Sequence, residues 1–185
     1  MGQILPFTPE KLIVPILLSR NRVRNSLLEQ LQNRYGRIDY ASPDLPFPFT
    51  HYYDEEMGTP ITRLIVSFDR LVDPGILARI KIETNRLECE YAAEGKRKVN
   101  LDPGLLSLSR LILASSKDGS HRIPLDRGIY AEVTLVYEGG EYRALPWTCP
   151  DYASREYRSI LKQIRTLYKA QISDRSRRGS ADGAG

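Results

Sequence analysis

The polar residues best suited to hold an anion or a metal ion gather between Arg97 and Tyr137. Asp102 comes directly before a Pro-Gly pair, and Asn100 lies two residues before Asp102. Asp102, placed at the end of a strand, could serve as a metal ligand or as a general base. The alternative is an ordinary turn, because Asn, Asp and Pro-Gly sequences also stabilise turns that have no function. We predict a catalytic role for Asp102 and a ligand-binding role for Asn100.

A Lys-Asp-Gly-Ser-His-Arg loop follows at residues 117–122. Lys117 and Arg122 are suited to bind a phosphate group, and a Gly-Ser turn offers backbone N–H groups to an anion. His121 could donate a proton or bind a metal ion. The alternative is a solvated hairpin loop with its usual charges. We predict ligand binding by Lys117 and Arg122, and catalysis by His121.

Glu132 lies within a strongly apolar strand pattern. Because side chains alternate between the two faces of a strand, Glu132 shares its face with Thr134 and Val136. Its carboxylate therefore points either to solvent or into a site. We assign it to ligand binding.

Two further groups have weaker patterns. His51 precedes the acidic run Asp54-Glu55-Glu56, which could contribute to a divalent metal site or could be a solvated loop. The last helix carries a basic face that could contact RNA or an acidic protein, or could be solvated. Its residues are Arg155, Arg158, Lys162, Arg165 and Lys169.

Several secondary structure elements are needed to position these residues. Apolar runs bounded by Pro and Gly predict strands at 11–19, 61–68, 96–101, 105–114, 129–137 and 142–147. Stripes of apolar residues at helical spacing predict three helices, within 20–36, 73–95 and 154–172. The second begins with Asp73 as N-cap and a proline at its first position. Pro15 interrupts the first strand, which indicates a bulge or an edge position. Residues 37–60 contain four prolines and several aromatic residues, which predicts a long ordered loop.

The length of 185 residues suits one domain with a sizeable core. We predict an α+β domain over 1–172, with a mixed or antiparallel sheet, three main helices and a split βαβ (ferredoxin-like) core. The small and polar residues 173–185 indicate a disordered tail. The net charge of +4 is a mild excess, with basic and acidic residues interleaved, so clustered charge for duplex DNA is missing.

Several classes of protein are excluded by missing patterns. No apolar run is long enough to span a bilayer, and the N-terminal run lacks the basic region and cleavage site of a signal peptide. The two cysteines have no metal-binding spacing. No P-loop, dinucleotide-binding, HExxH or GxSxG motif occurs. We therefore expect a cytoplasmic protein.

Five segments resemble one prokaryotic family, the domain-of-unknown-function family 4416. They are SPDLPFPFTHYYDEEMG, VSFDRLVDPGILARIKIETNRLE, KRKVNLDPGLLSLSRLILASSKDGSHRI, GIYAEVTLVY and PWTCPDYAS. The resemblance covers residues 9 to 170 and brings no established activity with it. Some members carry the label GTP-binding protein, which would imply a nucleotide ligand.

Two functional hypotheses follow. In the first, the protein binds a phosphate-bearing small molecule or nucleotide and could be a metal-assisted phosphohydrolase with a divalent cofactor. Lys117, His121 and Arg122 then meet the anion, while three carboxylate and amide groups hold a metal ion or the polar end of the ligand. These three are Asn100, Asp102 and Glu132. In the second, the chain is a non-catalytic module that binds RNA or a protein through the basic last helix and the aromatic segment 47–53.

Overall fold

The computed structural model describes residues 2–19 and 23–182 of the chain. Within them, one sheet has the strand order β10-β9-β7-β6-β1-β4-β2, and β5, β3 and β8 add to β1, β4 and β9 respectively. All of these pairings are antiparallel. The strands are β1 (Glu10–Leu18), β2 (Ile38–Ala41), β3 (Leu45–Pro46), β4 (Thr62–Val72), β5 (Val99–Leu101), β6 (Gly104–Leu106), β7 (Arg110–Ser115), β8 (Arg122–Asp126), β9 (Ile129–Glu138) and β10 (Glu141–Ala144).

Three long helices accompany the sheet: α1 (Arg24–Tyr35), α3 (Leu77–Glu90) and α5 (Arg155–Asp182). Two short helices, α2 (Asp54–Met57) and α4 (Pro150–Ala153), and a 3-10 turn, η2 (Pro74–Ile76), complete the described elements. As expected, Asp73 caps η2, because its side chain accepts a hydrogen bond from the backbone N–H of Gly75 at 2.7 Å. The predicted α+β domain with an antiparallel sheet and three main helices is confirmed.

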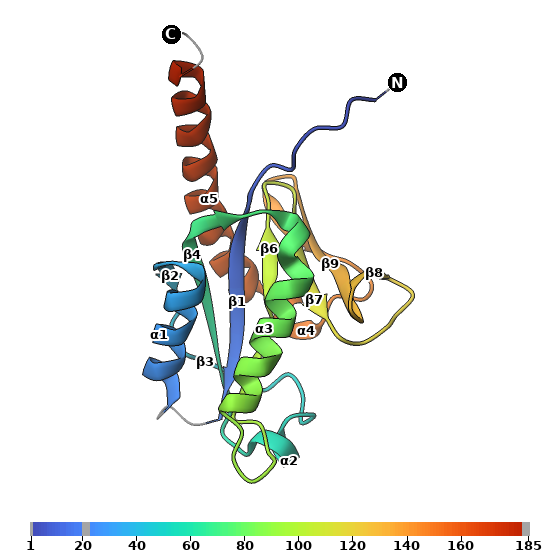
Figure 1. Cartoon of the computed structure of the whole chain (residues 1–185). Helices are drawn as coiled ribbons and strands as arrows, with labels where there is room; N and C mark the ends of the chain where they lie inside the picture. Colours follow the sequence, from blue (N-terminus) through green and yellow to red (C-terminus); the bar gives the residue numbers. More distant parts are fainter. Residues whose placement is uncertain (1, 20–22, 183–185) are drawn as a thin grey trace.

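The helices cover the two faces of the sheet in different ways. In Figure 1, α1 and α3 lie on one face and α5 lies on the other. Each face of the sheet has its own hydrophobic core, and strand β1 contributes to both. Leu12 and Val14 pack with α1 and α3, and Ile13 packs with α5 on the opposite face. A strand buried on both faces is apolar without alternation, which explains the continuous run at 11–18. Pro15 lies where the pairing of β1 changes from β6 to β5, so its missing N–H leaves no ladder bond open.

The first elements show how the sheet is interleaved. Strand β2, which follows β1 and α1 in sequence, does not pair with β1, because β4 lies between the two. This order is compatible with the predicted split βαβ arrangement. The ferredoxin-like core itself stays a prediction.

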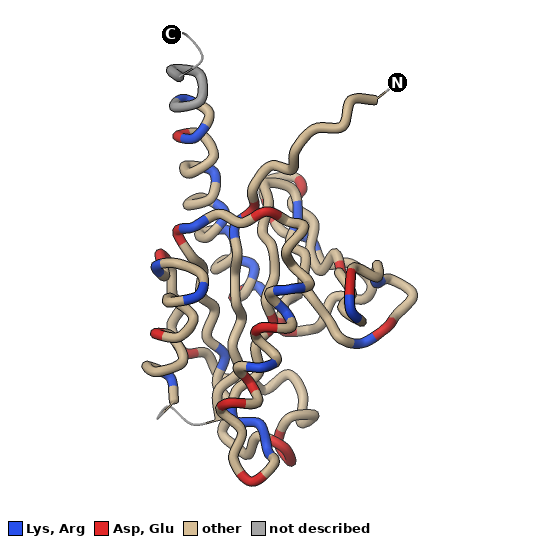
Figure 2. Tube along the Cα trace, in the orientation of Figure 1, with Lys and Arg blue, Asp and Glu red and all other residues tan. Residues whose placement is uncertain are grey.

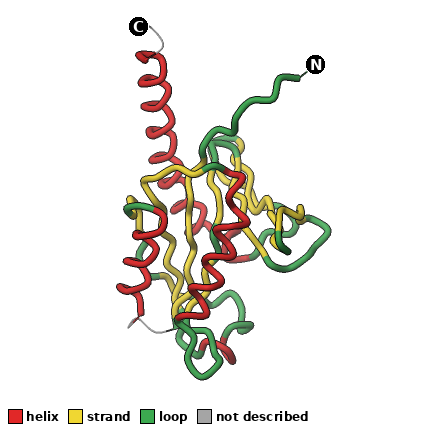
Figure 3. The backbone as a smooth tube through the Cα atoms, viewed as in Figure 1, coloured by secondary structure: helices red, strands yellow, loops and turns green. Residues whose placement is uncertain are grey.

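Some expected boundaries were wrong. The predicted strand 105–114 is two strands, β6 and β7, because the Ser107 hydroxyl accepts hydrogen bonds from the backbone N–H groups of Ser109 and Arg110 and closes a turn. Strand β8 was not predicted, because Pro124 lies in its middle and its residues are polar or exposed; it is tolerated as an edge strand. Helix α3 ends at Glu90, before the expected closing residue Gly95. Figure 3 shows the loops that gather at the end of the sheet near α2 and beside β8.

The C-terminal helix also differs from the prediction. Helix α5 continues to Asp182, so the part of the predicted tail from 173 to 182 is helical. It extends beyond the sheet in Figure 1. The rest of that tail, 183–185, and the predicted start of the first helix at 20–22 lie outside the described residues, as does residue 1 of the predicted domain. No helix in the described part of the chain is long and apolar enough to cross a membrane.

Candidate functional site

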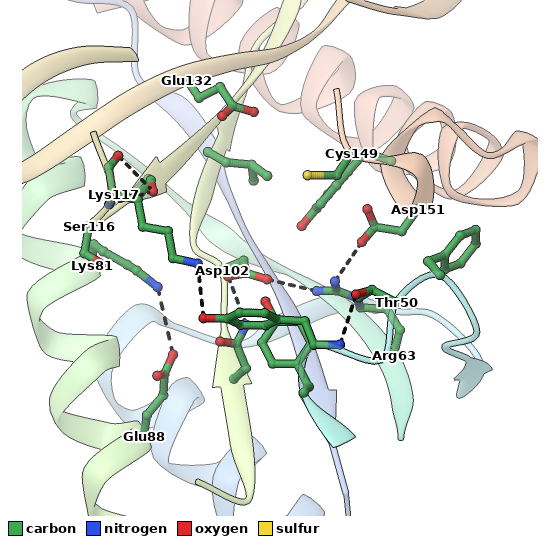
Figure 4. A pocket seen from close by; sticks show the side chains of 18 of the residues that line it. Thr50, Arg63, Lys81, Glu88, Asp102, Ser116, Lys117, Glu132, Cys149 and Asp151 are labelled. Atoms are coloured by element: carbon green, nitrogen blue, oxygen red, sulfur yellow. Dashed lines mark hydrogen bonds and ion pairs between the residues drawn. The ribbon is translucent and has the colours of Figure 1, made fainter. Parts of the chain in front are cut away.

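A cavity of about 780 Å³ opens between the carboxyl half of α3, the aromatic segment 47–53 and the sheet (Figure 4). Its wall combines charged side chains with the rings of Phe47, Phe49, Tyr52 and Tyr53. The charged lining residues are Arg63, Lys81, Glu88, Arg97, Asp102, Lys117, Arg122, Glu132 and Asp151. This is the size and mixture of apolar and polar groups that small-molecule sites show.

Arg63 is the central charge of the wall. It projects from β4, and only 3% of its side chain is exposed. Its Nη1 donates to Oδ2 of Asp102 at 3.1 Å, and its Nη2 donates to Oδ2 of Asp151 at 2.8 Å. Its guanidinium carbon lies 5.0 Å from the ring centroid of Phe47 and 5.7 Å from that of Tyr152. Burial raises the pKa of Asp151, although Arg63 opposes that rise.

The Asn-x-Asp-Pro-Gly segment forms the turn between β5 and β6 and also enters the cavity. The backbone N–H of Asp102 donates to the carbonyl of Pro15 at 3.0 Å, which fixes the turn against β1. The Asp102 carboxylate accepts from Nδ2 of Asn100 at 3.0 Å, and Asn100 accepts from Nη1 of Arg97 at 3.1 Å. Arg97 holds Glu56 through two bonds of 2.6 and 2.7 Å. The residues that form the turn between β5 and β6 therefore also line the cavity.

Helix α3 contributes a polar stripe that the sequence analysis missed. Lys81, Asn85 and Glu88 lie at helical spacing and all line the cavity. The Lys81 ammonium donates to the carbonyl of Leu101 at 2.7 Å, and Glu88 accepts from the N–H of the same residue at 2.7 Å. Burial raises the pKa of Glu88 even though Lys81 opposes the rise. The helix thereby holds the strand that precedes Asp102.

The other wall is built on β9. Glu132 is buried and points into the protein, which resolves the two orientations left open by strand alternation. Its Oε2 accepts from Nε of Arg122 at 2.9 Å and lies 3.1 Å from Nε2 of His121. Arg122 also donates from Nη1 to the carbonyl of Lys117 at 2.9 Å. One carboxylate therefore orders the loop that carries three of the predicted site residues.

His121 is the predicted residue that the cavity does not include. Five of the six predicted site residues line it, namely Asn100, Asp102, Lys117, Arg122 and Glu132. The ring of His121 stacks on Trp147 instead, with centroids 5.3 Å apart. Of the two residues predicted to be catalytic, Asp102 therefore lines the same cavity as Arg122, and His121 does not.

Lys117 connects the two loops beside the cavity. Its ammonium donates to the hydroxyl of Tyr52 at 3.4 Å and lies 4.6 Å from the centroid of that ring. The other lining cations each contact a carboxylate. Within the described part of the chain, Lys117 forms no ion pair, so no carboxylate neutralises its charge.

Of the two alternatives for His51 and the acidic run 54–56, a metal site or a solvated loop, the described residues do not form the metal site. His51 contacts Asp54 at 2.7 Å, while Glu56 is held by Arg97. Among residues 2–19 and 23–182, no group of three or more His, Cys, Asp or Glu side chains could hold a metal ion. Cys89 and Cys149 are free and line the cavity. Burial raises the pKa of the Cys149 thiol, so it is a weaker nucleophile at neutral pH.

The residues that sequence reasoning missed left a weak signal. Arg63 begins the buried stretch 63–68 of β4, whose other residues are apolar except Ser67, and a charge in a buried stretch indicates a partner or a site. Lys81 and Glu88 lie within a helix whose other buried residues are largely apolar. Asp151 and Tyr152 follow a proline in a short helix without an apolar pattern, and nothing local marks them.

Comparisons with known proteins agree with the resemblance noted above. The model of one family, described as Domain of unknown function (DUF4416), matches residues 8–168. No curated protein and no solved structure matches the chain. The matched range includes every charged residue that lines the cavity. Since this match spans most of the sequence, the chain belongs to the DUF4416 family.

Proposed function

We propose that the protein binds a small molecule bearing a phosphate or similar anionic group, such as a nucleotide, in the cavity between α3 and the aromatic segment 47–53. The observation that carries this proposal is that five of the six predicted site residues, which are distant from the aromatic segment in sequence, line one cavity of about 780 Å³. Cavities of roughly 300–1,000 Å³ with a few convergent polar groups are typical of small-molecule sites.

The anionic group would meet Lys117 and Arg122. Lys117 has no carboxylate partner in the described structure, and Arg122 is held by a single carboxylate, Glu132. Ser115 and Ser116, which line the cavity beside them, add hydroxyl donors. The rings of the aromatic segment offer apolar faces for the rest of the ligand.

An enzymatic version of the proposal is hydrolysis of a phosphate ester. Asp102 would act there as general base, because its carboxylate lines the cavity and is one-quarter exposed. Since the described residues contain no group of three or more His, Cys, Asp or Glu side chains that could hold a metal ion, a divalent ion that assists the reaction would have to be bound by the phosphate of the ligand as well. We expect the protein to act in the cytoplasm.

The test is isothermal titration of the purified chain with inorganic phosphate, phosphorylated metabolites and nucleotides, with and without divalent metal ions. We expect at least one phosphorylated compound to bind, and Lys117→Ala to weaken it about tenfold by removing one charge. The matched control is Lys162→Ala, since Lys162 is exposed on α5 away from the cavity lining. Absence of binding by every compound, or equal loss in both variants, would refute the proposal.

The second candidate is a binding module for RNA or an acidic protein. It is favoured by helix α5, which extends beyond the sheet in Figure 1 and carries several Lys and Arg positions in Figure 2, with an acidic one among them. Against it, Arg158 and Arg165 donate hydrogen bonds to the backbone carbonyls of Tyr142 and Leu108, so fewer of their N–H groups are free to bind a partner. RNA affinity that falls steeply with salt would support this candidate, and no salt dependence would exclude its RNA form.

A further inference from the structure

Charge is distributed unevenly within the cavity. Around Arg63, two carboxylates face a single guanidinium. On the β7–β9 side, two cations, Lys117 and Arg122, accompany the single carboxylate of Glu132. Figure 4 shows Arg63 and Asp151 on one side of the cavity and Lys117 on the other. The cavity thus has a negative pole at Asp102 and Asp151 and a positive pole at Lys117 and Arg122.

We propose that the negative pole binds a protonated amino group of the same ligand whose anionic group meets Lys117, so that the ligand of this cavity is zwitterionic. This inference rests on the proposed function and names the chemical class of its ligand. The reacting or recognised molecule would carry an ammonium at one end and a phosphate or similar anion at the other.

Asp102 provides the accessible acceptor at the negative pole. Its carboxylate accepts one hydrogen bond from Asn100 and one from Arg63. An ionised carboxylate has about four lone-pair positions, so two remain for a ligand. One quarter of the Asp102 side chain is exposed, whereas Asp151 is buried. Asp102 would therefore contact the ammonium, and Asp151 would add its charge from behind Arg63.

The rings beside this pole also favour a cation. The guanidinium of Arg63 already lies against Phe47 and Tyr152 at cation–π distances. Tyr53 lines the cavity as well, and burial together with the nearby charge of Asp102 raises the pKa of its hydroxyl to about 12. An anion placed here would be repelled by the two carboxylates, whereas an ammonium would offset their excess charge.

The experiment compares matched probes on the full chain by isothermal titration. One series consists of ω-aminoalkyl phosphates with two to six carbons, and the other of ω-hydroxyalkyl phosphates of the same lengths. The two series share the phosphate and differ only in the charge of the other end. We expect one length of aminoalkyl phosphate to bind about tenfold more tightly than its hydroxyl partner at pH 7. Asp102→Asn should abolish that preference, because the variant has no charge at this position to distinguish the ammonium from the hydroxyl end.

The control variant is Asp126→Asn, because Asp126 is an exposed carboxylate that contacts an exposed arginine outside the cavity. It should keep the preference. Equal affinity of the two series, or a preference that persists in a folded Asp102→Asn protein, would overturn this inference while the proposed function stands. Failure of both series would overturn the inference and count against phosphate binding as well. If Asp102→Asn does not fold, the comparison of the two probe series on the unmodified protein still tests whether the ligand is zwitterionic.

Discussion

The guanidinium of Arg63 donates to the carboxylate of Asp102 at 3.1 Å across 39 positions of sequence. The same guanidinium holds Asp151, another 49 positions further along, at 2.8 Å. One buried side chain on β4 therefore brings together the β5–β6 turn and the short helix α4. Because two carboxylates share this cation, the net charge of these three side chains is negative, and Asp102 keeps acceptor positions open toward the cavity.

The first prediction concerns Arg63. Arg63→Met should lower the free energy of unfolding by about 3–5 kcal/mol, because it leaves Asp102 and Asp151 close together with no cation between them. Urea denaturation at pH 7 measures the change. Arg143→Met is the matched control, since its partner Glu138 is exposed and exposed pairs contribute about 0–1 kcal/mol. A similar small change in both variants would show that the two carboxylates do not depend on Arg63.

The second prediction uses the raised pKa of Glu88. Burial raises it above the ordinary value of 4.5, so the folded protein keeps the proton at pH values at which the unfolded chain has lost it. The contribution of Glu88 to stability therefore falls as pH rises above about 4.5, until the group is ionised in both states. Glu88→Gln cannot titrate. The free energy of unfolding of the natural chain minus that of Glu88→Gln should decrease from pH 4.5 to 7.5.

Urea titrations of both proteins at several pH values within that range measure this difference. Comparing the two proteins cancels the titration of all other groups. A difference that stays constant or grows with pH would contradict the raised pKa of Glu88.

The sequence predicted the parts of the site that lie in one segment and missed the parts that need the fold. Asn100, Asp102 and Glu132 were recognisable because polar residues at strand ends or within apolar strands are unusual. Arg63, Lys81 and Asp151 come from a strand and two helices that are distant in sequence, and only the packing of these elements places them around the same cavity as Asp102. In the same way, the strands with continuous apolar runs were predicted, while β8 was missed because an edge strand needs no apolar pattern.

The third prediction concerns Gly104, which directly follows the Asp102-Pro103 turn. A Cβ atom at this position would lie 2.5 Å from the carbonyl oxygen of Ile112 and 2.6 Å from a methyl group of Leu113. Gly104→Ala should therefore push β6 away from β7 and cost about 1–3 kcal/mol. Thermal or urea unfolding measures it, with Gly2→Ala as control because no atom lies within 4 Å of that position. If the free energy of unfolding of Gly104→Ala is unchanged, β6 and β7 can move apart without loss of stability and the prediction is wrong.

The last prediction concerns Lys11, whose side chain is fully buried in β1. Its ammonium donates to the carboxylate of Asp39 and, at 2.8 Å, to Oε1 of Gln171 on α5. Burial disfavours the charged ammonium and lowers the pKa of Lys11, while the hydrogen bond to Asp39 opposes that change. Lys11→Met should destabilise the protein by about 3–5 kcal/mol, because the Asp39 carboxylate loses its cation.

The double variant Lys11→Met/Asp39→Leu shows whether the single variant is destabilised by the loss of the Lys11–Asp39 attraction or by the buried charge that is left without a partner. Replacing both members of a buried pair by apolar residues is often neutral, so the double variant should recover most of the lost stability, measured by urea denaturation. The matching single variant, Asp39→Leu, should lower the free energy of unfolding as much as Lys11→Met does, since it leaves the Lys11 ammonium buried without its carboxylate partner. Should the double variant be less stable than either single one, the contacts of the pair with Ser67 and Gln171 would contribute more than its charges do.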